Sequence, residues 1–222
     1  MGIFCRATWG NFVIPIQLQL EPPDFAQKVR DPGLKFLAGV PTPQGKDAWK
    51  SRDYWRKALN DLYVAYGHIC AYTAIWIPKP AGIPTVDHFI PKSIDPGKAY
   101  EWSNFRLACH TVNTWKASYQ DVLDPFHLGD NWFVIDFYLL EVKPNLNLDS
   151  EVQEKVCATI SRLRLNGPEC RGNRENWFNE YCSGNITFNY LKRRAPFIAY
   201  ELERQKLAHT IIASMAKVRK PK

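Results

Sequence analysis

The sequence predicts an α+β fold in which a short β-hairpin followed by a helix lies inside a mainly helical chain. Two strand-like segments, 84–90 and 104–109, lead directly into a helical stretch at about 111–119. Apolar residues recur at helical spacing over 47–66 and again after residue 150. The order strand, strand, helix therefore forms the expected centre of the fold, with helices on both sides of it in the sequence.

The composition is that of a globular protein. The chain of 222 residues is long enough to bury a core without disulfides. Hydrophobic residues make up 45% of it and charged residues 23%, which excludes a disordered chain. No apolar run approaches the roughly 18 residues that span a bilayer. We therefore expect a soluble protein with no membrane partner.

The N-terminus and the cysteines indicate the compartment. The first residues lack the charged start and the small-residue cleavage site of a signal peptide. The six cysteines show no dense spacing pattern, as a disulfide framework would. We therefore expect a cytoplasmic protein in which most thiols are free.

The positive charge is concentrated at the C-terminal end. Residues 192–222 hold nine Lys or Arg and two Asp or Glu, whereas residues 1–191 hold twenty of each. The candidates for phosphate contact are the run Leu191–Arg194 and the tail Lys217–Lys222. The alternative is that both are solvated ends without a binding role.

Residues 1–46 are predicted to form an extended, proline-rich arm. Six prolines lie within the first 45 residues, and each removes a hydrogen-bond donor and restricts the residue before it. A long helix is therefore excluded there. The arm either binds a partner protein or packs on its own domain.

Residues 47–125 contain the predicted hairpin and its surroundings. An amphipathic helix is expected over 47–66, with Gly67 as its stop, followed by a short β-rich run at 69–77. Pro91 ends the strand at 84–90, and a polar loop leads to the strand at 104–109.

Residues 126–222 are predicted to be mainly helical with a basic end. The segment 132–140 is expected to form a buried strand or the first half of a hairpin. Helices are expected at 150–165, at 174–181 and, as one long helix, at 188–218.

Several polar residues follow the predicted hairpin at fixed intervals. Asp87 and His88 end the first strand, Asn104 begins the second, and Asn113 and Lys116 lie on the following helix. This set, over about thirty residues, resembles the HNH nuclease family, also called His-Me finger or ββα-metal nucleases. The resemblance implies a ββα-metal core that binds one divalent cation. It also implies that Asn104 holds the catalytic histidine in its working orientation.

The residue types suit phosphodiester hydrolysis. A neutral imidazole accepts a proton near neutral pH, so His88 is the expected general base. Hard cations such as Mg²⁺ and Mn²⁺ prefer oxygen ligands, which Asp87 and the amide of Asn113 supply. Three basic residues near this set are expected to bind substrate: Lys92, Arg106 and Lys116. For Lys116, bracing of the loop is the alternative to phosphate contact.

A structural zinc site is not expected. Many members of the family carry two Cys-x-x-Cys pairs, but here only Cys70 and Cys109 are left, one from each pair. Two thiolates do not make a closed tetrahedral zinc site. We expect these two cysteines to pack near each other in an apolar setting.

The leading functional hypothesis is a metal-dependent endonuclease that cuts DNA. The proline-rich start, a Cys-Ala-Tyr segment at 70–72, Asp-Pro-Phe at 124–126 and the helical C-terminal half are similar to HNH subunits of Septu-type anti-phage systems. That resemblance implies an ABC-type ATPase as partner, in some systems together with a retron. The alternatives are an inactive nucleic-acid-binding or assembly module and an RNase that acts on tRNA.

Overall fold

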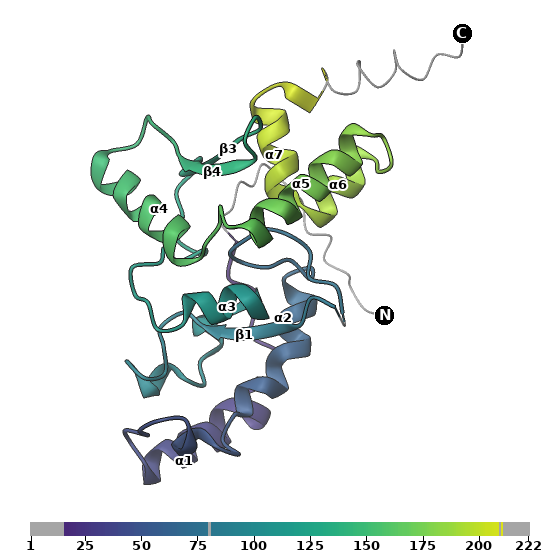
Figure 1. Cartoon of the computed structure of the whole chain (residues 1–222). Helices are drawn as coiled ribbons and strands as arrows, with labels where there is room; N and C mark the ends of the chain where they lie inside the picture. The colour runs from purple at the N-terminus through teal and green to yellow at the C-terminus, as the bar shows by residue number, and fades with distance from the viewer. Residues whose placement is uncertain (1–15, 80, 209, 211–222) are drawn as a thin grey trace.

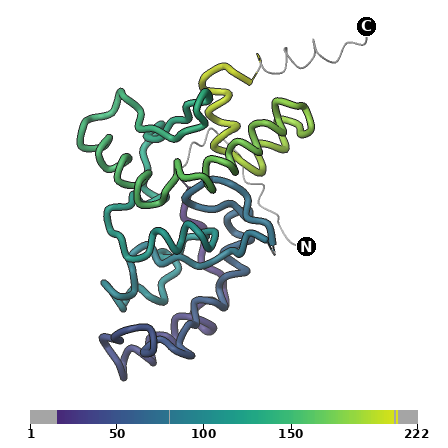
Figure 2. Tube along the Cα trace, in the orientation of Figure 1, coloured from purple at the N-terminus to yellow at the C-terminus, as the bar shows by residue number. Residues whose placement is uncertain are grey.

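Helices and two small β-sheets alternate along the chain, which confirms the predicted α+β class. The computed structural model describes residues 16–79, 81–208 and 210. The N-terminal helices lie at one end of the molecule, the first sheet with helix α3 lies in the middle, and the C-terminal helices lie at the other end (Figure 1). The trace in Figure 2 shows the same progression. Within this described part, no helix is long and apolar enough to cross a membrane.

The first sheet is an antiparallel hairpin whose second strand leads directly into a helix. Strand β1 (Pro84–His88) pairs with β2 (Phe105–Cys109), with Pro84 opposite Cys109 and His88 opposite Phe105. Helix α3 (His110–Lys116) begins at the next residue. The predicted order of strand, strand and helix is therefore present. The loop between the strands contains the 3₁₀ turns η4 (Pro96–Lys98) and η5 (Trp102–Asn104).

The prediction of an extended arm over residues 1–46 is wrong for its second half. The π-helix η1 (Ala26–Arg30) continues into α1 (Asp31–Gly39). Pro32 lies in the first turn of α1, where a helix needs no intrahelical N–H, and the wider π turn before it makes room for the proline ring. Residues 1–15 of the predicted arm lie outside the described residues.

This N-terminal helical segment packs on the hairpin. Phe25 is fully buried, and its ring makes edge contacts with Trp102 at 5.6 Å and Phe105 at 5.8 Å between centroids. The segment therefore covers the outer side of β2 and forms part of the core.

The segment 47–77 is less regular than its pattern predicts. The expected helix over 47–66 is divided into η2 (Asp47–Trp49), η3 (Tyr54–Ala58) and α2 (Leu59–Ala65). Gly67, with φ of 59°, follows the helix end as predicted. The β-rich run 69–77 forms only the bridge between Ile69 and Trp76, because the backbone turns between them, with Ala74 at φ of 50°.

The described residues of the C-terminal part form a second hairpin and four helices. Strands β3 (Phe133–Asp136) and β4 (Glu141–Pro144) form the hairpin, and α4 (Ser150–Arg162) and α5 (Pro168–Cys182) follow. The single helix expected over 188–218 is divided into α6 (Phe188–Arg194) and α7 (Pro196–Arg204), since Pro196 cannot donate the hydrogen bond that would continue α6. Residues 211–222 lie outside the description.

The packing of α1 against the first sheet generates a stability prediction. A Cβ added at Gly33 would lie 2.2 Å from the ring of Tyr100, which is fully buried and donates a hydrogen bond to the Arg52 carbonyl. We expect Gly33→Ala to lower the free energy of unfolding by about 1–3 kcal/mol through overpacking.

Gly39→Ala is the matched control for that measurement. Gly39 lies on the same helix, and a Cβ added there meets nothing within 4 Å. Urea unfolding of both variants is the measurement. Equal stability of the two variants would contradict the tight contact between α1 and Tyr100.

Candidate active site

One cleft brings together four of the residues predicted from the sequence. Asp87 and His88 at the end of β1 and Asn113 on α3 line the same open cleft of about 780 Å³. Lys92 lines it too, and the segment 43–56 forms the opposite wall. The hairpin and α3 thus converge on a single space that a substrate can enter.

The hydrogen bond of His88 identifies which ring nitrogen is free. Nε2 lies 2.9 Å from the carbonyl oxygen of Ala99. A carbonyl only accepts, so Nε2 carries the proton and Nδ1 is the nitrogen that accepts one. The ring is 8% exposed and is held edge-on by Trp55 and Phe105, at 4.9 and 5.4 Å between centroids. His88 is therefore a fixed neutral imidazole with one basic nitrogen left.

Burial, together with the positive charges of Lys92 and Lys116, lowers the pKa of His88 to about 3, although the hydrogen bond to the Ala99 carbonyl acts in the opposite direction. The imidazole is therefore neutral across the physiological pH range, which is the form that a general base needs.

Asp87 is buried beside two donors. Its carboxylate lies 3.2 Å from Nζ of Lys116 and accepts a hydrogen bond of 2.5 Å from the hydroxyl of Tyr72. Burial raises the pKa of this carboxyl group, while Lys116 and Tyr72 act in the opposite direction. The two partners fix the carboxylate at the cleft, and each of its oxygens keeps further acceptor capacity.

The orientation of the Asn113 amide follows from its neighbour. Nδ2 donates to Oγ1 of Thr85 at 3.0 Å, and the Thr85 hydroxyl donates in turn to the Ala108 carbonyl at 2.9 Å. Because the hydroxyl proton is already used, Oγ1 must accept, which assigns the nitrogen side of the amide to Thr85. The amide oxygen of Asn113 accepts no hydrogen bond from any described residue, so it remains available to a ligand of the cleft.

The residues at this cleft fit a hard divalent cation. Asp87 and Asn113 offer a carboxylate and an amide oxygen, the donors that Mg²⁺ and Mn²⁺ prefer. In the described ranges no group of three or more His, Cys, Asp and Glu residues is placed to hold a metal ion. A cation at Asp87 and Asn113 would therefore need water and substrate oxygens for its other positions.

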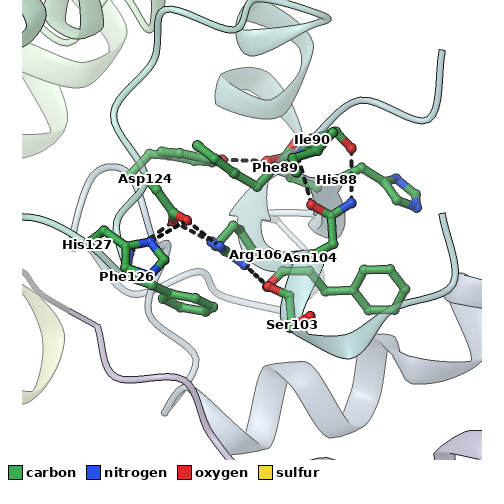
Figure 3. A network of polar contacts seen from close by, with 12 residues as sticks. His88, Phe89, Ile90, Ser103, Asn104, Arg106, Asp124, Phe126 and His127 are labelled. Atoms are coloured by element: carbon green, nitrogen blue, oxygen red, sulfur yellow. Dashed lines mark hydrogen bonds and ion pairs between the residues drawn. The ribbon is translucent and has the colours of Figure 1, made fainter. Parts of the chain in front are cut away.

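Asn104 is a positioning residue and does not line the cleft. Its amide oxygen accepts from the Ile90 N–H at 2.8 Å, and its amide nitrogen donates to the carbonyls of Ile90 and Lys98 at 2.9 and 3.0 Å. Figure 3 shows the amide facing the backbone of Ile90, two residues after His88. Asn104 thus ties the turn behind His88 to the loop that carries Ala99.

Lys116 is not placed to bind substrate. Its side chain is fully buried, and Nζ donates to the carbonyls of His88 and Phe89 at 3.0 and 3.1 Å in addition to its contact with Asp87. Three oxygen partners inside the protein satisfy its three donors. Of the two roles expected from the sequence, the geometry gives it bracing of the loop.

Arg106 is not placed in its predicted substrate-binding role either, because it too is buried and bound to partners inside the protein. It is 2% exposed, and its guanidinium makes two hydrogen bonds to Asp124, at 2.8 and 2.6 Å. Another nitrogen donates to the Ser103 carbonyl, and the group lies 3.5 Å above the ring of Phe126. Figure 3 shows these partners around Arg106. The residue joins β2 to the segment at 124–127.

The opposite wall of the cleft was not expected from the sequence. It carries Trp49 and Trp55, and Nζ of Lys92 lies 5.8 and 5.3 Å from the centroids of their rings. The exposed side chains of Lys46 and Lys50 lie on the same wall. Helical spacing assigns both tryptophans to a core face, and the signal for binding in the sequence is weak: two lysines, Lys46 and Lys50, close to Trp49.

Cys70 and Cys109 lie next to each other. Their side chains make a hydrogen bond, and Cys70 is 1% exposed. The two thiols join the segment before β1 to the residue before α3.

Neither a comparison of the chain with protein-family models nor one with curated proteins finds a match.

The buried neutral His88 predicts an acid-sensitive fold. A histidine with an ordinary pKa near 6.5 in the unfolded chain and about 3 in the folded protein binds more protons when unfolded between those values. We expect the free energy of unfolding to fall with decreasing pH in this window, by up to about 1.4 kcal/mol per pH unit from this group.

His88→Gln removes the titrating group and keeps a donor for the Ala99 carbonyl. Urea unfolding between about pH 7 and pH 4 is the measurement. The difference in stability between the two proteins should change with pH by this slope. A pH-independent difference would show that His88 titrates alike in the folded and unfolded states.

Proposed function

We propose that the protein is a metal-dependent endonuclease of the HNH kind that hydrolyses DNA phosphodiester bonds in the cytoplasm. The observation that carries this proposal is the convergence, in one cleft, of two oxygen donors from Asp87 and Asn113 with His88, whose Nδ1 makes no hydrogen bond to a described residue. A hairpin followed by a helix supplies all three residues.

In the proposed reaction His88 acts as the general base. Nδ1 takes a proton from a water molecule as its oxygen attacks the phosphorus atom and the bond to the leaving oxygen breaks. The leaving oxygen then takes a proton from solvent. The Ala99 carbonyl stabilises the imidazolium that forms, since it already accepts the proton of Nε2. Asp87 and Asn113 would hold a divalent cation, which would supply charge stabilisation to the phosphate oxygens.

The opposite wall suits a polyanionic substrate. Lys46, Lys50 and Lys92 line the cleft, and the described part of the chain holds no ion pair of any of them with a carboxylate. Trp55 beside them is half-buried and can offer part of its ring to nucleobases or sugars, whereas Trp49 is buried and supports it from the core. Phosphate groups that enter here would replace counterions of the three lysines.

We further propose that the nuclease acts within an anti-phage complex with an ABC-type ATPase, in some systems with a retron. This part rests on the sequence resemblance alone. A surface for a partner is offered by the segment before α1, where Leu18 is 51% and Leu20 93% exposed.

His88→Ala tests the general base. We expect it to lower the rate of DNA cleavage in Mg²⁺ or Mn²⁺ by about 10²–10⁴-fold. His127→Ala is the matched control, because the side chain of His127 is 81% exposed and lies outside the lining of the cleft. Cleavage of duplex DNA, single-stranded DNA and tRNA is followed on one gel.

The outcomes separate the alternatives. Cleavage by His88→Ala at the wild-type rate would overturn the assignment of the base. Preferential cleavage of tRNA would favour the RNase, and binding of nucleic acid without cleavage in either metal would favour an inactive assembly module.

Asn113→Ala tests the cation site. We expect the Mn²⁺ concentration for half-maximal cleavage to rise by about tenfold or more, because one oxygen ligand is lost. Thr114→Ala on the same helix is exposed and serves as the control. Mn²⁺ binding measured by calorimetry should weaken in parallel, and an unchanged metal requirement would remove Asn113 from the proposed ligands.

A further inference from the structure

A second group of basic residues lies away from the cleft. It joins His68 and Lys79, which follow α2, to Arg194 at the end of α6. The backbone N–H of Trp76 donates to the Arg194 carbonyl at 2.7 Å, which brings the two parts of the chain together. None of the three residues lines the cleft that holds His88.

Aromatic rings hold these side chains in place. The Arg194 guanidinium lies 4.1 Å from the ring centroid of Trp76, and Nζ of Lys79 lies 4.4 Å from that of Tyr63. The same Tyr63 ring stacks on His68, with 4.0 Å between centroids and 12° between planes. The cationic groups of Lys79 and Arg194 therefore pack on aromatic rings, which restricts their movement.

The charge of this group is not compensated within the protein. In the described portion of the chain, no carboxylate forms an ion pair with Lys79, Arg193 or Arg194, whereas Lys192 beside them pairs with Glu203 at 2.7 Å. Lys79 donates instead to the neutral amide oxygen of Asn60 at 3.1 Å. The positive charges of Arg194 and Lys79 add to burial in lowering the pKa of His68.

The indole N–H of Trp76, next to the Arg194 guanidinium, is buried and has no acceptor among the described residues, so it is not exposed to a ligand at this surface. The feature that suits an anionic ligand is the pair of cations without an acidic partner.

We propose that Lys79, Arg194 and His68 form a second phosphate-binding surface that contacts the backbone of the nucleic acid outside the cleft. The identity of the ligand rests on the proposed function. Arginine binds phosphate through its planar fork of donors, and lysine binds it as a point charge.

The test is binding of a labelled duplex of about thirty base pairs, without divalent metal so that nothing is cut, over about 50–200 mM salt. We expect the double variant Lys79→Glu, Arg194→Gln to bind about tenfold or more weakly, with the slope of log K against log salt reduced by about two. The control is Lys155→Glu, which changes an exposed lysine of α4 by two charges, as Lys79→Glu does, while the double variant changes three. Single-stranded DNA and tRNA of similar length are the other arms and show which nucleic acid supplies the phosphates.

If the double variant binds the duplex with the same affinity as Lys155→Glu, the proposal is overturned. Lys79→Glu alone is also measured, because Lys79 is exposed and its replacement does not disturb the packing of Arg194 on Trp76. If this single variant binds with the wild-type affinity and an unchanged salt slope, Lys79 is not part of the surface.

The test of this surface and the test of the nuclease activity can fail independently of each other. Loss of binding in these variants of a protein that cuts nothing supports the surface and rejects the nuclease. If cleavage is normal and neither substitution changes binding, the nuclease is supported and the surface is rejected.

Discussion

The candidate site depends on a buried ammonium group that holds two secondary-structure elements together. Lys116 extends from the last turn of α3 to the end of β1, where its Nζ contacts the Asp87 carboxylate and the carbonyls of His88 and Phe89. A fully buried charge is tolerated only when such partners replace its hydration, and loss of one partner from a buried pair costs about 3–5 kcal/mol. The contact therefore fixes how α3 lies across the hairpin, and with it the separation of Asn113 from Asp87.

A second set of contacts fixes the other side of His88. Asn104 ties the backbone of Ile90 to that of Lys98, and the neighbouring Ala99 carbonyl receives Nε2 of His88. Next to it, Arg106 connects β2 to Asp124. The histidine is thus held through its backbone by Lys116 and through its ring by the loop that Asn104 closes. Such support from surrounding residues is what a preorganised catalytic group requires.

The sequence could predict those parts of the site that depend on local order. Asp87, His88 and Asn113 lie on a hairpin and helix whose bounds follow from strand pattern, Pro91 and helical spacing, so their meeting in one cleft is largely a local outcome. The arm was predicted wrongly because prolines in a helix's first turn do not break it.

Burial of charged groups could not be predicted in the same way. Lys116 and Arg106 are residue types that are mostly exposed, and only the tertiary contacts with Asp87 and Asp124 show that they are internal. The wall with Trp49 and Trp55 and the contact of Arg194 with Trp76 join segments far apart in the chain. No periodicity reports such contacts, since periodicity describes only which face of an element is apolar.

The low pKa of His88 poses a chemical problem that the cleft itself can resolve. An imidazole with a pKa of about 3 is always neutral at physiological pH, but it is a weaker base than one whose pKa lies near the working pH. Part of the shift comes from the charge of Lys92, which faces the same cleft. In the proposed reaction a substrate phosphate beside Lys92 offsets that charge and adds a negative charge near the ring, and both effects raise the pKa of His88. The base would then become stronger only when the substrate is in place, so the residue that binds the phosphate also controls the reactivity of the residue that activates the water.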